Sequence, residues 1–224
     1  MLAVLIINHG TAAATQGCLD ALAGQLPAGA RVHVLDNGSA AEDVERLSEA
    51  VATHATRVTL SLSLKNLGFA GGMNLLLRQA LADSAVDQVL LLNSDTAPKA
   101  GFIAAMQARL DPAAQAHMVA ANMRNPRADA VDSLGITLYR STLASNRKRE
   151  DEILLGPSGG CALFSANLTL ANASSLARLS ISPNCSLLSF PSRVSCARSR
   201  VIGSSSRYFS SSSFVRELAG SDIE

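Results

Sequence analysis

The stretch "LAVLIINHG", residues 2–10, is a continuous apolar run that ends in Asn-His-Gly. Strands that are buried on both faces of a parallel sheet have this pattern, because helices cover both faces. No Lys or Arg precedes the run, and it is too short for a secretion signal with its cleavage site. It also falls short of the roughly 20 apolar residues that a membrane span needs. We therefore expect a buried strand over residues 2–7.

Similar apolar segments recur along the chain and predict further strands: "RVHVLDNGS" (31–39), "RVTLSLS" (57–63), "DQVLLLNSDT" (87–96) and "AHMVAANMR" (116–124). The segments between them predict helices at 13–26, at 40–54, from Met73 onward and at 99–110. Such alternation of strand and helix is typical of an α/β fold with a mostly parallel sheet.

The composition excludes several classes of function. The 224 residues suffice for one large domain or two small ones, and the net charge is +1. Nearly neutral charge argues against nucleic-acid or membrane binding that is driven by charge alone. The chain has no C-x-x-C pair and its histidines are scattered, which argues against a zinc site. We expect reduced cysteines in a cytoplasmic protein.

Polar or glycine-rich segments follow the predicted strands: "NHG", "DNGS", "LKNLGFAGG" and "NSDT". Ligands of open α/β sheets bind outside the carboxyl ends of the strands. We therefore expect Asp36, Asn66 and Asp95 to lie along one edge of the sheet. His9 also ends a strand, where it can face a ligand.

Two of these segments have a structural alternative. Asp95 suits Mg²⁺ or Mn²⁺, which bind through one or two carboxylates plus substrate phosphates; alternatively it caps a helix that starts near Pro98. Asp36 can accept hydrogen bonds from a nucleotide; alternatively Asp36-Asn37-Gly38 forms a turn and Ser39 caps the next helix.

The glycine-rich segment "NLGFAGGMN" (66–74) lacks both the Gly-Lys-Ser/Thr ending of a phosphate loop and the G-x-G-x-x-G pattern of dinucleotide sites. Gly71 and Gly72 are expected to start a helix. Its exposed amides can favour an anion, or the glycines let the helix pack tightly on the sheet.

The second half of the chain is less regular. Residues 125–156 predict a surface segment, a loop over a site, with the basic cluster Arg147–Arg149. "GPSGGCALFS" (156–165) predicts a tight turn into a strand. Residues 153–216 contain no Asp, Glu or Lys and many Ser. A disordered tail, an unusual β segment and out-of-frame translation from about residue 165 all explain this; the abrupt change favours the last.

Five motifs in order, "VLIINHG", "VLDNGS", "NLGFAGGMN", "VLLLNSDT" and "GPSGGCALF", resemble the family 2 glycosyltransferases, especially the bacterial rhamnosyltransferase-like members. The resemblance covers residues 2–165. It implies a GT-A fold, that is, an α/β mostly parallel sheet flanked by helices. It also implies that the acceptor half is incomplete. A nucleotide-sugar-binding GT-A domain would occupy residues 1–165, and residues 166–224 would form a Ser/Arg-rich atypical tail, disordered or out of frame.

The resemblance also implies the site residues. Those expected to bind the donor are Asn8, Asp36, Asn37, Asn66, Gly68, Phe69, Asn74 and Asn93. Asp95 would hold Mg²⁺ or Mn²⁺, with Asn93 at the first position of a D-x-D-like motif. Gly159 and Gly160 would lie on the acceptor side.

The implied activity is metal-dependent, inverting transfer of a hexose, rhamnose by resemblance, from a dTDP- or UDP-sugar. The acceptor would be a glycan or a lipid-linked acceptor of cell-surface polysaccharide. No nucleic acid is expected as a partner, and the expected location is the cytoplasm, at the inner face of the membrane where the acceptor is lipid-linked.

The sequence departs from the family at one point. Members carry a Glu-Asp pair after the motif that corresponds to "GGCALF", which supplies the general base, and this chain has no acid there. The alternative function is therefore a catalytically inactive nucleotide-binding remnant or a partner-binding module. The catalytic residue stays unassigned.

Overall fold

The computed structural model describes residues 1–111, 118–125, 130–138, 144–149, 160–165, 180–182 and 188–189. The chain divides into two units, Met1–Gln107 and Ala108–Glu224. The division expected between residues 165 and 166 borders residues outside the described part, so it stays a prediction.

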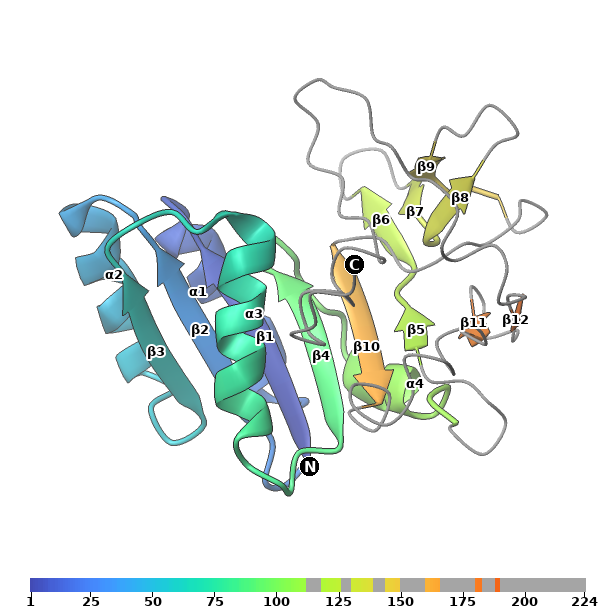
Figure 1. Ribbon diagram of the computed structural model, residues 1–224, viewed down its shortest axis with the longest axis horizontal. Helices are drawn as coiled ribbons and strands as arrows, with labels where there is room; N and C mark the ends of the chain where they lie inside the picture. The colour runs from blue at the N-terminus through green and yellow to red at the C-terminus, as the bar shows by residue number, and fades with distance from the viewer. Residues whose placement is uncertain are drawn as a thin grey trace, which may run out of the picture. The chain divides into compact units, whose positions relative to one another are not determined.

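Four parallel strands form the sheet of the first unit, in the order β4-β1-β2-β3. They are β1 (Leu2–Asn8), β2 (Arg31–Asn37), β3 (Val58–Ser63) and β4 (Gln88–Asn93). The helices of this unit are α1 (Ala12–Ala23), α2 (Ala41–Ala52), α3 (Gly68–Leu81) and α4 (Phe102–Gln107). α3 covers one face of the sheet, and α1 and α2 cover the other (Figure 1). The expected alternation of strand and helix is confirmed.

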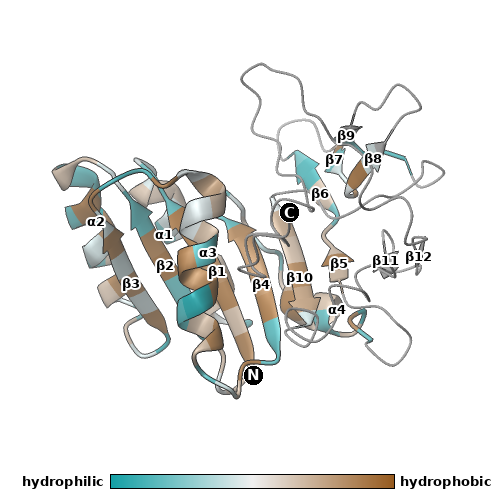
Figure 2. Cartoon of the chain, viewed as in Figure 1, coloured by the Kyte–Doolittle hydropathy of each residue, from teal (hydrophilic) through white to brown (hydrophobic). Residues whose placement is uncertain are grey.

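The core lies along the central strands. Residues 3–6 of β1 are fully buried, as are Val32, Val34 and Leu35 of β2. Figure 2 shows hydrophobic residues along β1, β2 and β4. Each fully buried Leu, Ile or Val contributes about 1.5–3 kcal/mol to folding. The continuous apolar runs are therefore explained by helices on both faces of the sheet.

The helix α3 begins earlier than the sequence predicts. It was expected from Met73 with Gly71 and Gly72 at its start, but its first residue is Gly68, which has φ of +70°. Gly72 packs directly on the sheet: a Cβ atom there would lie 2.9 Å from Ile7 Cδ1 and 3.1 Å from Leu35 Cδ2. Close packing of helix on sheet is therefore the reason for this glycine.

The amino end of α1 is capped by a carboxylate from α2. The N-cap residue Thr11 makes no side-chain cap bond, and Asp43 Oδ1 instead accepts from Ala12 N at 3.0 Å. Burial raises the pKa of the Asp43 carboxyl, but hydrogen bonds from Ala12 N–H, Asn8 and Ser39 outweigh it and leave this pKa below its usual value. The charged form is thus favoured in the folded protein.

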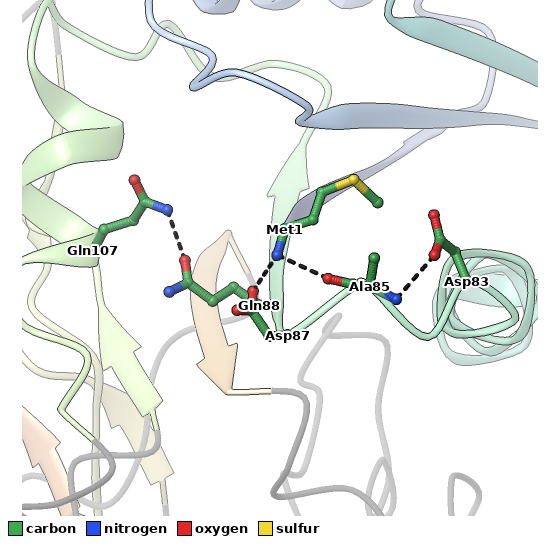
Figure 3. A network of polar contacts seen from close by, with 6 residues as sticks. All are labelled: Met1, Asp83, Ala85, Asp87, Gln88 and Gln107. Atoms are coloured by element: carbon green, nitrogen blue, oxygen red, sulfur yellow. Dashed lines mark hydrogen bonds and ion pairs between the residues drawn. The ribbon is translucent and has the colours of Figure 1, made fainter.

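The amino ends of the strands are joined by a separate polar network (Figure 3). The Met1 ammonium donates to Asp87 Oδ1 at 2.6 Å and to Ala85 O at 2.8 Å. Gln107 Nε2 donates to Gln88 Oε1 at 2.7 Å. Because the ion pair is exposed, it stabilises the fold by at most about 1 kcal/mol.

The second unit has one mixed sheet region and two small antiparallel sheets among its described residues. The mixed region has the order β12-β11-β5-β10, formed by β5 (Met118–Ala120), β10 (Cys161–Ser165), β11 (Ser180–Ser182) and β12 (Leu188–Ser189). The small sheets pair β6 (Met123–Asn125) with β7 (Ala130–Ser133), and β8 (Ile136–Leu138) with β9 (Ala144–Asn146). The predicted strand after "GPSGG" is confirmed as β10.

Two predictions for this unit are wrong in part. The single strand expected at 116–124 is two strands, β5 and β6, with a break at residues 121–122. The segment predicted to lie on the surface contains strands, and Arg147 is only 1% exposed. The backbone of Arg147 accepts from Leu134 N and donates to Gly135 O. Lys148 and Arg149 are exposed as expected.

Among the described residues, no helix is both long and apolar enough to cross a membrane.

The packing of Gly72 predicts the effect of a larger side chain. Gly72→Val forces Ile7 and Leu35 to move and is expected to lower the free energy of unfolding by about 1–3 kcal/mol, the usual cost of overpacking. Gly17→Val in α1 is the matched control, because a Cβ at that position has no atom within 4 Å apart from its chain neighbours and the backbone of its own helix. Urea denaturation of both variants checks this, and equal stability of the two would contradict it.

The cap on α1 predicts a pH-dependent contribution from Asp43. Asp43→Asn removes the charge and is expected to lower the free energy of unfolding at pH 7 by about 1 kcal/mol. Because the pKa of Asp43 is lowered in the folded state, its contribution is complete above the unfolded value of about 3.9 and is lost as the pH falls below it. Denaturation curves from pH 7 to acid should therefore converge. A difference that persists at low pH would contradict this.

Candidate functional site

The carboxyl ends of the strands bring polar residues to one edge of the first unit. The strand registers place Asn8 beside Asp36, Ile7 beside Asn93, and Asn37 beside Ser63. Because the strands are parallel, the turns that follow them all leave from this edge. The segments around Asn66 and Asp95 are two of these turns.

Asn8 is the centre of a buried polar network at this edge. Its side chain is fully buried. Nδ2 donates to Asp36 Oδ1 at 3.0 Å and to Asp43 Oδ2 at 2.7 Å. Oδ1 accepts from Thr11 Oγ1 at 3.1 Å and from Thr15 Oγ1 at 2.9 Å. Through these hydrogen bonds the Asn8 amide connects β1, β2, α1 and α2.

Asp36 is held within a turn. It is 1% exposed, and its carboxylate accepts from Asn8 Nδ2, from Ser39 Oγ and from Ser39 N, the last at 3.1 Å. This is the turn geometry that the sequence offered as the alternative to nucleotide binding. A carboxylate has about four acceptor sites, and these bonds occupy three of them. The expected N-cap role of Ser39 is wrong, because Ala40 holds that position.

The asparagines Asn37 and Asn66 fix the glycine-rich loop. Asn37 Oδ1 accepts from Leu67 N at 2.9 Å, and its Nδ2 donates to Asn66 Oδ1 at 3.1 Å and to Gly68 O at 3.2 Å. The loop lies against the end of β2: a Cβ on Gly38, whose φ is +79°, would come within 2.7 Å of Asn66 N. Glycine is required there both by φ and by the close approach.

The start of α3 offers less to an anion than the sequence suggests. Leu67 N donates to Asn37 Oδ1, and Gly68 N donates to Asn66 Oδ1 at 2.8 Å. These amides of the helix entry are therefore already satisfied by asparagine carbonyls. Further along α3, Phe69 is half-buried and Asn74 is 5% exposed.

Asp95 lies exposed in the turn after β4, and Asn93 at the end of that strand is half-buried. The helix-cap alternative for Asp95 is wrong, because α4 begins only at Phe102. The turn is fixed instead by Thr96, whose Oγ1 donates to Asn93 O at 2.8 Å. The Asp95 carboxylate thus stays open to solvent.

The buried thiol of Cys18 lies beneath this turn, 3.7 Å from Thr96 Oγ1. Burial raises the pKa of the Cys18 thiol to about 11, although the Thr96 hydrogen bond lowers it and the charge of Asp95 raises it. The thiol is therefore protonated at neutral pH, and it is a packing residue rather than a nucleophile.

A divalent cation fits the chemistry of Asp95. Among the described residues, no group of three or more His, Cys, Asp or Glu side chains is arranged so that it could hold a metal ion. Mg²⁺ and Mn²⁺ do not need such a cage, since one or two carboxylates plus substrate phosphates suffice. The open carboxylate of Asp95 at the strand edge meets that requirement.

Some site residues were not identified from the sequence. Asp43 accepts hydrogen bonds from Asn8 and from the first amide of α1. Its sequence position gives no sign of this, because acids are common in the first turn of a helix, where the helix dipole favours them. Thr15 lies on the buried side of α1 and carries no distinctive motif. Of the two glycines expected on the acceptor side, Gly160 directly precedes β10, and Gly159 lies outside the described residues.

Comparisons with known proteins agree with this architecture. A mannosyltransferase from Pyrobaculum calidifontis, solved with GDP-Man and Mn²⁺, is 19% identical with a TM-score of 0.54, over 75% of this chain and 45% of that one. TarS residues 1–349 from S. aureus is 17% identical with a TM-score of 0.54, over 75% and 47%. At these identities the likeness shows the fold, and the expected GT-A fold is confirmed.

A third solved structure is the glucosyl-3-phosphoglycerate synthase from Mycobacterium tuberculosis with Mn²⁺, UDP-Glc and phosphoglyceric acid. It is 18% identical with a TM-score of 0.50, over 75% of this chain and 58% of that one. The chain therefore spans about half the length of the solved structures that it matches. No curated protein matched the sequence.

The family model described as glycosyl transferase family 2 matches residues 3–169, which is well over half of the chain. The matched range includes all four parallel strands and the turns at their carboxyl ends. The chain belongs to glycosyl transferase family 2.

Proposed function

We propose that this chain binds a nucleotide-sugar donor at the carboxyl edge of β1, β2 and β4 and transfers its sugar, with inversion, to an acceptor hydroxyl. The observation that supports this proposal most strongly is that one edge of one parallel sheet brings together five residues expected at a donor site: Asp36, Asn37, Asn66, Gly68 and Asp95. That edge is where open α/β sheets bind ligands.

The residues of this edge have separate tasks in the proposal. Asp36 accepts hydrogen bonds from the base or ribose, in addition to those from Ser39 that fix its turn. Asn66, Gly68 and Phe69 close over the nucleoside, and Asn74 supports them from α3. Asn8 binds the donor indirectly, because its buried amide fixes the Asp36 carboxylate.

Asp95 is the proposed ligand of Mg²⁺ or Mn²⁺, with Asn93 beside it on the same turn. A bound divalent cation stabilises the charge that develops on the nucleoside diphosphate as it leaves. The exposed Asp95 carboxylate supports this role. The similar mannosyltransferase and glucosyl-3-phosphoglycerate synthase, both solved with Mn²⁺, support it as well.

The proposed identities of the donor sugar, its nucleotide and the acceptor come from the family resemblance. We propose a dTDP- or UDP-sugar as donor, with rhamnose as the sugar, because the motifs are similar to those of rhamnosyltransferase-like members. The solved structures contain GDP-Man and UDP-Glc, which supports a nucleotide sugar as the class. The proposed acceptor is a glycan or a lipid-linked saccharide, and Gly159 and Gly160 would lie on the acceptor side of the site. A lipid-linked acceptor would be bound at the cytoplasmic face of the membrane.

A second candidate is a nucleotide-binding protein without transferase activity. Inversion requires a base within hydrogen-bond reach of the acceptor hydroxyl. Residues 153–216 contain no Asp or Glu, although the family resemblance places the base in this part of the chain. This observation favours a chain that binds the donor but does not transfer the sugar.

The proposed metal ligand predicts a specific loss of binding. Asp95→Asn is expected to weaken the Mn²⁺-dependent binding of UDP or dTDP about 10- to 100-fold or more, since even outer-shell partners of a metal contribute that much. Asp83→Asn is the matched control, because Asp83 is also exposed but precedes the amino end of β4. Calorimetry with and without Mn²⁺ measures both. Unchanged binding in Asp95→Asn would place the metal elsewhere.

The two candidate functions differ in turnover. For a transferase we expect release of nucleoside diphosphate from dTDP-rhamnose or UDP-sugars that needs Mg²⁺ or Mn²⁺ and an acceptor, and that is lost in Asp95→Asn. Chromatography of the released nucleotide measures it. Tight donor binding without any release would contradict transfer and support the nucleotide-binding protein.

A further inference from the structure

His9, in the turn after β1, contacts the glycine-rich loop. Its Nε2 lies 3.2 Å from Asn66 Nδ2, and both side chains are exposed. Either nitrogen of a neutral imidazole can carry the proton, so the distance alone does not say which group donates. The surrounding hydrogen bonds decide this, because they lead back to backbone groups that can only donate or only accept.

The orientation of the Asn37 amide follows from the backbone. Leu67 N–H can only donate, so the Asn37 atom 2.9 Å away is the oxygen. Gly68 C=O can only accept, so the atom 3.2 Å from it is the Asn37 nitrogen. Two backbone groups of opposite character therefore agree on one orientation.

The orientation of the Asn66 amide follows in turn. Asn37 Nδ2 is a donor, so the Asn66 atom 3.1 Å from it must be the oxygen. Gly68 N–H donates to the same oxygen at 2.8 Å. The remaining nitrogen of Asn66, a donor, is therefore the atom that faces His9.

We propose that His9 is a positioning residue for the donor site: its neutral imidazole, protonated on Nδ1, accepts from Asn66 at Nε2 and holds the loop of Asn66, Gly68 and Phe69 over the strand ends. Protonation puts N–H on both ring nitrogens, so that two donors face each other and the contact is lost. The part of this inference that concerns the donor rests on the proposed function.

Charged groups lie on the elements around this contact. Lys65 precedes Asn66 in the loop. The carboxylates of Asp36 and Asp43 both accept from Asn8, the residue before His9. These groups persist in every variant below, so changes in the pH response report on His9 and Asn66 themselves.

Nitrogen NMR of the full ¹⁵N-labelled chain tests the contact without any ligand. For the neutral form of the His9 ring we expect the proton on Nδ1 and a bare Nε2. As the pH falls, the Asn66 side-chain amide and the Gly68 backbone amide should shift with the same midpoint as the His9 ring. A dominant Nε2–H form, or a Gly68 signal that ignores the His9 titration, would overturn the proposal.

Two variants and a control sharpen this test. His9→Gln supplies an oxygen that accepts from Asn66 at every pH, so the coupled shift of Gly68 should disappear. Asn66→Asp presents an acceptor to Nε2, so that nitrogen should become protonated. His54→Gln is the control, because His54 contacts Asp20 at the amino side of β3 and should not affect the Gly68 signal.

Nucleotide affinity tests the consequence for the donor. Below the midpoint that the spectra give for the His9 ring, the loss of one hydrogen bond predicts that UDP or dTDP, with Mn²⁺, binds about fivefold more weakly to the wild type than to His9→Gln. At a pH above that midpoint, the two proteins should bind the nucleotide equally. Because the two proteins are compared at the same pH, the titration of the nucleotide phosphate affects both affinities equally. Equal binding of the two proteins at both pH values would overturn the positioning role. Absence of nucleotide binding at any pH would instead contradict the proposed function, while the spectra still decide the His9–Asn66 contact.

Discussion

The buried side chain of Asn8 is the interaction on which the strand edge depends. A fully buried amide must satisfy its donors and acceptors within the protein, since an unsatisfied one costs about 1–3 kcal/mol. Asn8 does so through Asp36 and Asp43 on one side and Thr11 and Thr15 on the other. These partners come from β2, α2 and α1, so one residue fixes the relative positions of the turns that form the site.

A second group of side-chain amides, those of Asn37 and Asn66, fixes the glycine-rich loop. Asn37, at the end of β2, binds the backbone of the glycine-rich loop and the side chain of Asn66. Gly38 allows the loop to lie directly on the strand end, and Gly72 allows α3 to lie on the sheet. The glycines and asparagines therefore serve one purpose: they bring backbone close to the edge where a nucleotide is proposed to bind.

The sequence predicts the first unit well because its signals are local and strong. Apolar runs that end in polar turns identify β1 to β4, since burial on both faces needs such runs. The start of α3 is not predicted, because three glycines lower helix propensity, and the packing of Gly72 and the bonds from Asn37 and Asn66 that compensate depend on tertiary structure. The burial of Arg147 was missed as well, because a basic cluster normally indicates a solvated surface.

The candidate site was predictable in its residues but less so in their roles. The motifs place Asp36 and Asp95 at strand ends, yet turn formation and ligand binding demand the same residue types there. The structure shows that Asp36 serves the turn, and that Asp95 caps no helix and stays exposed. Interactions between distant turns, such as Asp43 with Asn8, leave no pattern in a single sequence.

The central claim is that the carboxyl edge of β1, β2 and β4 binds a nucleoside diphosphate through a cation on Asp95. The most direct measurement is the anomalous signal of Mn²⁺ in crystals grown with UDP or dTDP. The account predicts a manganese peak within coordination distance, about 2 Å, of an Asp95 carboxylate oxygen and of the diphosphate, with the base near Asp36. A nucleotide bound at another face of the protein, or manganese bound away from Asp95, would contradict it.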